Sequence, residues 1–226
     1  TLTSSYGARG IQGQVPLVET DIASAQMIKY AANAFLATRV SFINEVGGLC
    51  ERLGADVKEV ARGMGYDPRI GHSYLEAGIG FGGPCLEKDL QALIKIAEAN
   101  GYEPRLLRST HERNEHQVQE VIAQVKGLTG NLLYNKHIAI FGLSFKAGTN
   151  DVRNSLALRI LDQLVREGAL VRAYDPVAIP EAKTLRPNLV YCEDPYDVVA
   201  QAEALLILTD WPAFRELDYE AIKARM

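Results

Sequence analysis

The chain has 226 residues and a net charge of −4, with 47% hydrophobic and 23% charged residues. This composition excludes an intrinsically disordered chain and argues against a nucleic-acid-binding protein, which usually carries a basic excess. No apolar run approaches the roughly 20 residues of a membrane-spanning helix, so no membrane partner is expected. Three cysteines without metal-ligand spacing indicate a reduced, cytoplasmic protein. At about 150 residues per domain, the length allows one large domain or two small ones.

The first part of the chain has a helical pattern. Residues 1–16 match no element and are expected to form a tail or linker. Residues 22–53 contain no proline and carry apolar side chains at helical spacing, which predicts one unusually long helix. Such a helix often packs against its own copy, so we expect a homodimer through it. Further helices are predicted at 56–65, 86–100 and 104–126. Residues 17–130 are therefore expected to form an all-helical dimerisation domain.

The hydrophobic period changes near residue 137. From there, short apolar runs typical of buried strands alternate with amphipathic helices. Strands are predicted at 137–143, 170–174, 189–192 and 204–209, and helices at 155–167, 195–201 and 218–226. This alternation is typical of a parallel sheet with right-handed crossovers. The predicted fold class is α/β, in which the all-helical region with its long central helix precedes a Rossmann-like parallel domain over residues 131–226.

A glycine-rich loop at residues 78–83 separates two of the predicted helices. Gly78, Gly80 and Gly83 match the spacing of a dinucleotide-binding fingerprint, but no convincing strand precedes them, so we reject that interpretation. Glycines also let a backbone wrap closely around a ligand and expose its N–H groups. The loop is therefore a candidate ligand-binding segment.

Cys85 directly follows this loop, at the expected start of a helix, where the helix dipole stabilises a thiolate. Lys88 and Asp89 share a helix face with it, and a cation and a carboxylate beside a thiol suit nucleophilic catalysis. The alternative, a small buried apolar side chain, is the state expected for Cys50 and Cys192. No metal site is predicted from the four scattered histidines, His72, His111, His116 and His137.

Several segments, taken in chain order, resemble the UDP-glucose 6-dehydrogenase family of nucleotide-sugar dehydrogenases. The signature is the glycine-rich loop that runs into Cys85 and a following Lys-Asp pair. The similar segments are residues 29–35, 41–45, 67–71, 80–89, 141–146 and 150–153. The resemblance covers residues 17–226, and it implies NAD-dependent oxidation of the C6 alcohol of UDP-glucose to a carboxylate.

The resemblance also implies catalytic roles. Two NAD+ act in succession, and Cys85 attacks the aldehyde intermediate, which leads through a thiohemiacetal to a thioester that water hydrolyses. Lys29 and Asn33 would stabilise oxyanions or hold the catalytic water, and their i,i+4 spacing places both on one helix face. Asp89 would be the partner of that water.

Substrate and cofactor contacts are implied in the same way. Arg69 would bind the substrate of the dimer mate, and Phe145 and Lys146 would contact the nucleotide sugar from the second domain. Lys88 and Arg153 would contact NAD. The loop would wrap the sugar and phosphates through Glu76, Gly78, Gly80, Phe81 and Gly82. Without the family, most of these residues have an ordinary interpretation as surface, loop or helix-end side chains.

The sequence also departs from the family pattern. The turn after the first predicted strand holds Gly142 and Gly148 but no G-x-G, so the sheet is expected to bind the nucleotide sugar and not NAD. No dinucleotide-binding unit precedes residue 20, so we expect a fragment that lacks the NAD domain and is inactive alone. Glu87 stands where family members commonly have proline.

The alternatives to a UDP-glucose dehydrogenase are a GDP-mannose or UDP-N-acetylhexosamine dehydrogenase, or a non-catalytic dimerisation and sugar-nucleotide-binding module.

Overall fold

The computed structural model describes residues 17–226, and the predicted tail or linker at 1–16 lies outside them. Within the described range there are nine helices, α1 (Ile22–Leu53), α2 (Val57–Gly65), α3 (Leu86–Ala99), α4 (Arg105–Leu128), α5 (Leu156–Arg166), α6 (Ile179–Leu185), α7 (Pro195–Val198), α8 (Pro212–Arg215) and α9 (Tyr219–Arg225). The strands are β1 (His137–Phe141), β2 (Leu170–Tyr174), β3 (Val190–Tyr191) and β4 (Ala204–Ile207). Among residues 17–226, every helix is too short or too polar to serve as a membrane span.

The long helix α1 has the predicted bounds because both of its ends carry capping residues. The Asp21 side chain accepts a hydrogen bond of 2.9 Å from the Ser24 N–H at the first turn. Gly54 ends the helix in the left-handed conformation, at a φ of 71°. In between, 32 residues form one rod about 48 Å long, at 1.5 Å per residue.

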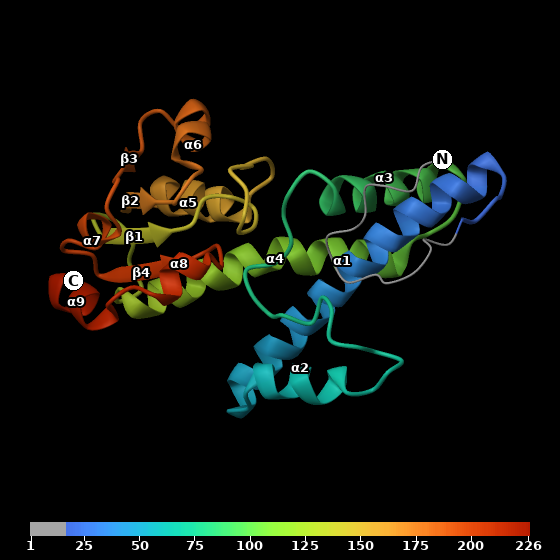
Figure 1. Cartoon of the computed structure of the whole chain (residues 1–226), viewed down its shortest axis with the longest axis horizontal. Coiled ribbons are helices and arrows are strands. Elements are labelled where there is room, and N and C mark those ends of the chain that lie inside the picture. The colour runs from blue at the N-terminus through green and yellow to red at the C-terminus, as the bar shows by residue number, and fades with distance from the viewer. Residues whose placement is uncertain (1–16) are drawn as a thin grey trace.

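Among residues 17–226, other elements cover only one face of α1. Ala34 and Ala37 are buried against α3 and α4, together with Phe81 of the glycine-rich loop and Leu90 of α3. Figure 1 shows α3 lying along the first half of α1, with α2 beside its far end. The opposite face exposes four large apolar residues at seven-residue intervals, here named the α1 stripe: Ile28, Phe35, Phe42 and Leu49.

The second half of the chain forms a four-stranded parallel sheet in the order β3-β2-β1-β4. Because successive side chains of a strand point to opposite faces, β1 contributes to two cores. Ile138 and Ile140 pack with α5, whereas Ala139 and Phe141 pack with α7, α8 and α9. Helices cover both faces of the sheet, which confirms the predicted Rossmann-like architecture.

Helix α4 connects the two halves (Figure 1). Its first half packs against α1 and α3, while Val118, Ile122 and Val125 in its second half are buried in the same core as the sheet. The domain boundary at residue 130 stays a prediction, but the packing shows that α4 belongs to both cores.

Two short helices, α6 and α8, were not expected from the sequence. Each has a proline at its start and only one or two turns, so neither shows an apolar repeat long enough to be recognised. At the start of α4, Pro104 occupies the capping position just before the helix, and not its first helical position.

Candidate active site

Cys85 stands at the point where the glycine-rich loop becomes α3. It is the residue that precedes the first turn, and its side chain is exposed. Its carbonyl accepts the Asp89 N–H at 2.9 Å, so the backbone of α3 already starts at the cysteine. The thiol therefore has the position at a helix N-terminus that the sequence predicted.

Asp89 gathers the polar side chains next to this cysteine. Its buried carboxylate accepts hydrogen bonds from Lys88 Nζ at 2.7 Å and Asn33 Nδ2 at 2.6 Å. Lys29 Nζ of α1 lies 3.8 Å from the same carboxylate. Lys29 and Asn33 are one turn apart on α1, so both point at the first turn of α3.

These contacts keep the Asp89 carboxylate charged. The hydrogen bond from Lys88 lowers the pKa of Asp89 most, and the Asn33 hydrogen bond and the Lys29 charge act in the same direction, while burial opposes them. In return, Asp89 raises the pKa of Lys88, with a smaller contribution from the charge of Cys85. The thiol and Lys88 therefore lie within electrostatic reach of each other.

Three amide side chains hold the backbone of the glycine-rich loop. Asn44 of α1 accepts the Gly78 N–H at 2.8 Å, and Gln117 of α4 donates to the Gly78 carbonyl at 2.8 Å. Asn114 of α4 is buried, accepts the Phe81 N–H at 2.8 Å and donates to the Phe81 carbonyl at 2.9 Å. The loop is thus fixed to both long helices before the chain reaches Cys85.

Close contacts explain the glycines at three positions. A Cβ atom at Gly80 would lie 2.5 Å from Asn114 Oδ1, and one at Gly82 would lie 2.5 Å from the Asn154 carbonyl oxygen. At Gly83 a Cβ would lie 2.5 Å from the ring of Phe145. Phe145, which follows β1, therefore packs directly on the loop that leads to Cys85.

Two exposed cations also follow β1. Lys146 lies with its ammonium 5.5 Å from the centre of the Phe145 ring. Arg153 forms an ion pair of 2.7 Å with Asp151, which raises the pKa of Arg153, and the charge of Cys85 adds a smaller effect in the same direction. Phe145 packs on Gly83, and the Gly83 N–H donates to the carbonyl of Asn154, the residue after Arg153, at 3.1 Å, so this segment lies against the loop that ends at Cys85.

Arg69 lies apart from this group in the single chain. Its side chain is 87% exposed and pairs with Asp67 at 2.7 Å. Arg39 of α1 donates to the carbonyls of Ile70 and Gly71, which fixes the turn that carries Arg69. Within residues 17–226, the hydrogen bonds and ion pairs of Arg69 do not reach the Cys85 group.

A cleft of about 930 Å³ adjoins the glycine-rich loop. Glu76 and Gly78 line one side of it, and Leu208 and Asp210, which follow β4, line another. In open parallel sheets, ligands bind beyond the carboxyl ends of the strands where the strand order reverses. Here that point lies between β1 and β4, since β2 and β3 extend the sheet on the other side of β1.

The same sheet edge does not fit NAD. A dinucleotide-binding sheet passes from its first strand through a short glycine turn into a helix, but α5 starts at Leu156, well after the end of β1 at Phe141. Asp175, at the position of the ribose-binding acid, is buried and accepts the N–H groups of Leu143 and Ala178 at 2.8 Å each. Its carboxylate is engaged by backbone and is not free for a ribose.

Sequence reasoning missed the loop-holding amides Asn44, Asn114 and Gln117. Amide side chains on long helices are ordinarily solvated, and only the fold shows that these three face the loop. It also missed a cluster of Glu87, His111 and Glu115, although the i,i+4 spacing of His111 and Glu115 was a signal for it.

Comparisons with known proteins agree with this architecture. Residues 23–116 match the central domain of the UDP-glucose/GDP-mannose dehydrogenase family, and residues 139–226 match the UDP binding domain of that family. A UDP-glucose 6-dehydrogenase of Bacillus subtilis is 47% identical over 209 residues, which are 92% of this chain and 45% of the relative. One from Rhizobium meliloti is 42% identical over 213 residues, which are 94% of this chain and 49% of the relative.

Solved structures give the same result. A UDP-glucose dehydrogenase from Pyrobaculum islandicum superposes with a TM-score of 0.84 at 38% identity, over 87% of this chain and 45% of that one. A GDP-mannose dehydrogenase from Pseudomonas aeruginosa gives a TM-score of 0.58 at 28% identity, over 89% of this chain and 48% of that one. The chain spans about half the length of the curated relatives that it matches. It belongs to the UDP-glucose/GDP-mannose dehydrogenase family.

Proposed function

We propose that this chain carries the thiol and the nucleotide-sugar site of a UDP-glucose 6-dehydrogenase, which oxidises the C6 alcohol of UDP-glucose to the carboxylate of UDP-glucuronate. The observation that carries the proposal is the place of Cys85 at the start of α3, one turn before Asp89, whose carboxylate contacts Lys88, Lys29 and Asn33. An exposed thiol at a helix N-terminus can act as the nucleophile on an aldehyde, and the neighbouring N–H donors can stabilise the oxyanion that forms.

Cys85 acts on the aldehyde that the first oxidation produces. Its thiolate forms a C–S bond to C6, and the carbonyl electron pair moves to oxygen, where an N–H donor such as Lys29 or Asn33 stabilises it. A second oxidation, in which C6 loses a hydride, gives the thioester. Water then attacks C6, the C–S bond breaks, and the thiolate leaves with the acid as product. Asp89 positions the donors that hold this water.

The nucleotide sugar binds across the two halves of the chain. The diphosphate and base lie at the reversal point between β1 and β4, with Phe145 and Lys146, and the sugar reaches along the glycine-rich loop to Cys85. Glu76, Gly78, Gly80, Phe81 and Gly82 form the wall of this path. The names of the relatives favour UDP-glucose over GDP-mannose or a UDP-N-acetylhexosamine.

NAD supplies the hydride acceptor of both oxidations when it is bound. The sheet does not fit a dinucleotide, so we assign NAD binding to the portion of the relatives that this chain does not match. Lys88 and Arg153 are exposed cations near the thiol, and we propose that they face the cofactor from this side. The three free cysteines suit a reducing, cytoplasmic setting.

We also propose a homodimer that pairs α1 with its copy. The α1 stripe is apolar and exposed, with Phe35 at 62% and Phe42 at 51%, and heptad spacing is the pattern of paired helices. A mate packed on α1 brings a second set of loops to the site, and Arg69, exposed in the single chain, is the substrate contact that we assign to the mate.

The test uses the 6-aldehyde of UDP-glucose, because the chain can then be tested without NAD. We expect UDP-glucose to bind in calorimetry, and the aldehyde to slow iodoacetamide alkylation of Cys85 more than UDP-glucose does at equal occupancy. Cys192 serves as the internal control, since its alkylation should not change. If UDP-glucose binds but the aldehyde protects Cys85 from alkylation no better than UDP-glucose does, the chain is a non-catalytic sugar-nucleotide-binding module. If GDP-mannose binds more tightly than UDP-glucose, the substrate is GDP-mannose.

A further inference from the structure

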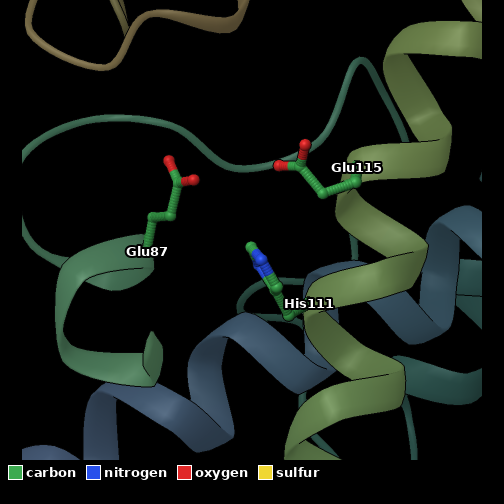
Figure 2. A group of neighbouring side chains, drawn as sticks. All are labelled: Glu87, His111 and Glu115. Atoms are coloured by element: carbon green, nitrogen blue, oxygen red, sulfur yellow. The ribbon is translucent and has the colours of Figure 1, made fainter. Parts of the chain in front are cut away.

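Three potential metal ligands meet outside the proposed active site (Figure 2). Glu87 comes from the first turn of α3, and His111 and Glu115 come from successive turns of α4. One ligand atom of each residue lies within 4.8 Å of the others. The three side chains point into one space between the two helices.

The first observation that points to a ligand in this space concerns His111. Its Nδ1 atom is buried and has no hydrogen-bond partner among the described residues. A buried nitrogen without a partner costs about 1–3 kcal/mol, so such atoms are rare in folded proteins. A metal ion would satisfy this nitrogen, because neutral imidazole offers its lone pair to metals.

The second observation that points to a ligand concerns Glu87. Its side chain is only 14% exposed, yet its contacts are long, at 3.8 Å to Arg159 Nη1 and 3.3 Å to Gln91 Nε2. A largely buried carboxylate is normally held by close donors or by a metal. Glu87 therefore has unused capacity to bind a cation.

Arg159 of α5 already supplies one positive charge. Its Nη1 donates to Glu115 at 2.9 Å, and its Nη2 pairs with the second oxygen of the same carboxylate. This hydrogen bonding lowers the pKa of Glu115. The two carboxylates and the guanidinium together carry a net charge of −1, and each carboxylate oxygen keeps a second lone pair for a metal.

We propose that Glu87, His111 and Glu115 bind a divalent first-row metal ion, with zinc as the best match. Two carboxylate oxygens and one imidazole nitrogen form a three-ligand site of the kind that zinc accepts, with water in the fourth position. Tetrahedral zinc places its ligands about 3.3 Å apart, so the separations between the ligand atoms, now up to 4.8 Å, would shorten by at most about 1.5 Å on binding.

Such an ion would fasten the first turn of α3 to α4. Because Glu87 is two residues from Cys85, the ion would pin the backbone that carries the thiol without touching the thiol itself. The proposal rests on the fold and not on the proposed dehydrogenase activity, so the two can fail separately.

The test is titration of the whole chain with Zn²⁺ in calorimetry, in a Cys85→Ser background that removes thiolate binding. We expect one ion per chain, and at least a tenfold loss of affinity in His111→Ala, since even the outer partners of a metal are worth that much. The matched control is His116→Ala, because His116 lies on the same helix and 3.6 Å from a carboxylate, Glu120. That variant should bind zinc as the parent does.

Two further variants keep the test decisive. Glu87→Gln should also weaken zinc binding at least tenfold, while Arg159→Gln should strengthen it several-fold, because it removes the competing cation. The Co²⁺-loaded parent should show an absorption spectrum of oxygen and nitrogen ligation, and His111→Ala should lose it. Absence of zinc binding by the parent at 1 mM, or equal binding by parent, His111→Ala and Glu87→Gln, overturns the proposal.

Discussion

At the scale of single residues, Asp89 shows how a buried carboxylate is kept ionised. Burial alone would raise its pKa, but the hydrogen bonds from Lys88 and Asn33 reverse the effect. The charge thus depends on side chains from two helices, so the residue also ties α3 to α1.

Asp89→Asn is expected to lower the free energy of unfolding by about 1–3 kcal/mol at pH 7, because charged hydrogen bonds are lost at a buried site. Since the pKa of Asp89 is lower in the folded state than the ordinary 3.8, its contribution is present above pH 3.8 and lost as pH falls through the lower value. The difference in the free energy of unfolding between parent and variant, measured by urea unfolding, should therefore decrease below pH 3.8. A difference that stays constant with pH, or an equal loss of unfolding free energy in the exposed control Glu45→Gln, would contradict this.

Asn114 acts on the glycine-rich loop in a similar way, through backbone hydrogen bonds to Phe81. Asn114→Ala leaves a buried N–H and a buried carbonyl without partners, which should cost about 2 kcal/mol. We expect faster hydrogen exchange in the loop, measured by mass spectrometry on the peptide that ends at Cys85. The control is Gln119→Ala, an exposed residue of the same helix, which should leave that exchange unchanged.

At the scale of elements, sequence patterns predicted the helices and strands that are long enough to show a hydrophobic repeat. The bounds of α1 were predicted because residues 22–53 contain no proline and carry apolar side chains at helical spacing. Helices α6 and α8 were not, since four to seven residues hold no repeat. The meeting of Phe145 with Gly83 could not be read from the pattern either, because it depends on how two regions 62 residues apart in sequence pack together.

The α1 stripe gives the element-scale prediction. Phe35→Glu combined with Phe42→Glu places charges in the proposed helix–helix contact, so the chain should change from dimer to monomer in sedimentation velocity. Leu128→Glu is the control, because Leu128 is also apolar and exposed but ends α4. A parent that is already monomeric at high micromolar concentration, or a double variant that stays dimeric, would rule out pairing through α1.

At the scale of the whole molecule, two hydrophobic cores share one helix. Leu90 belongs to the core of α1, α3 and α4, while Ile122 belongs to the core of the sheet. The sequence predicted two regions correctly by their periods, but it could not show that α4 enters both, because an amphipathic helix does not reveal which partners cover it.

The shared helix predicts that both cores unfold together. Leu90→Ala removes a fully buried side chain, which should cost about 2–5 kcal/mol. The only tryptophan of the chain, Trp211, lies in the sheet half, so its fluorescence reports the other core. We expect the variant to shift the fluorescence and circular dichroism midpoints equally. A fluorescence midpoint that stays at the parental value would show two independent units.

Helix α4 also sets the distance and angle between the two halves. It has 24 residues, about 36 Å of rod at 1.5 Å per residue, with one end in each core. A single inserted or deleted residue in its middle would turn one half by about 100° against the other and shift it by about 1.5 Å. Substitutions on its exposed side leave this geometry intact, whereas changes of length do not. In α4, substitutions on the exposed side should therefore be tolerated far better than insertions or deletions.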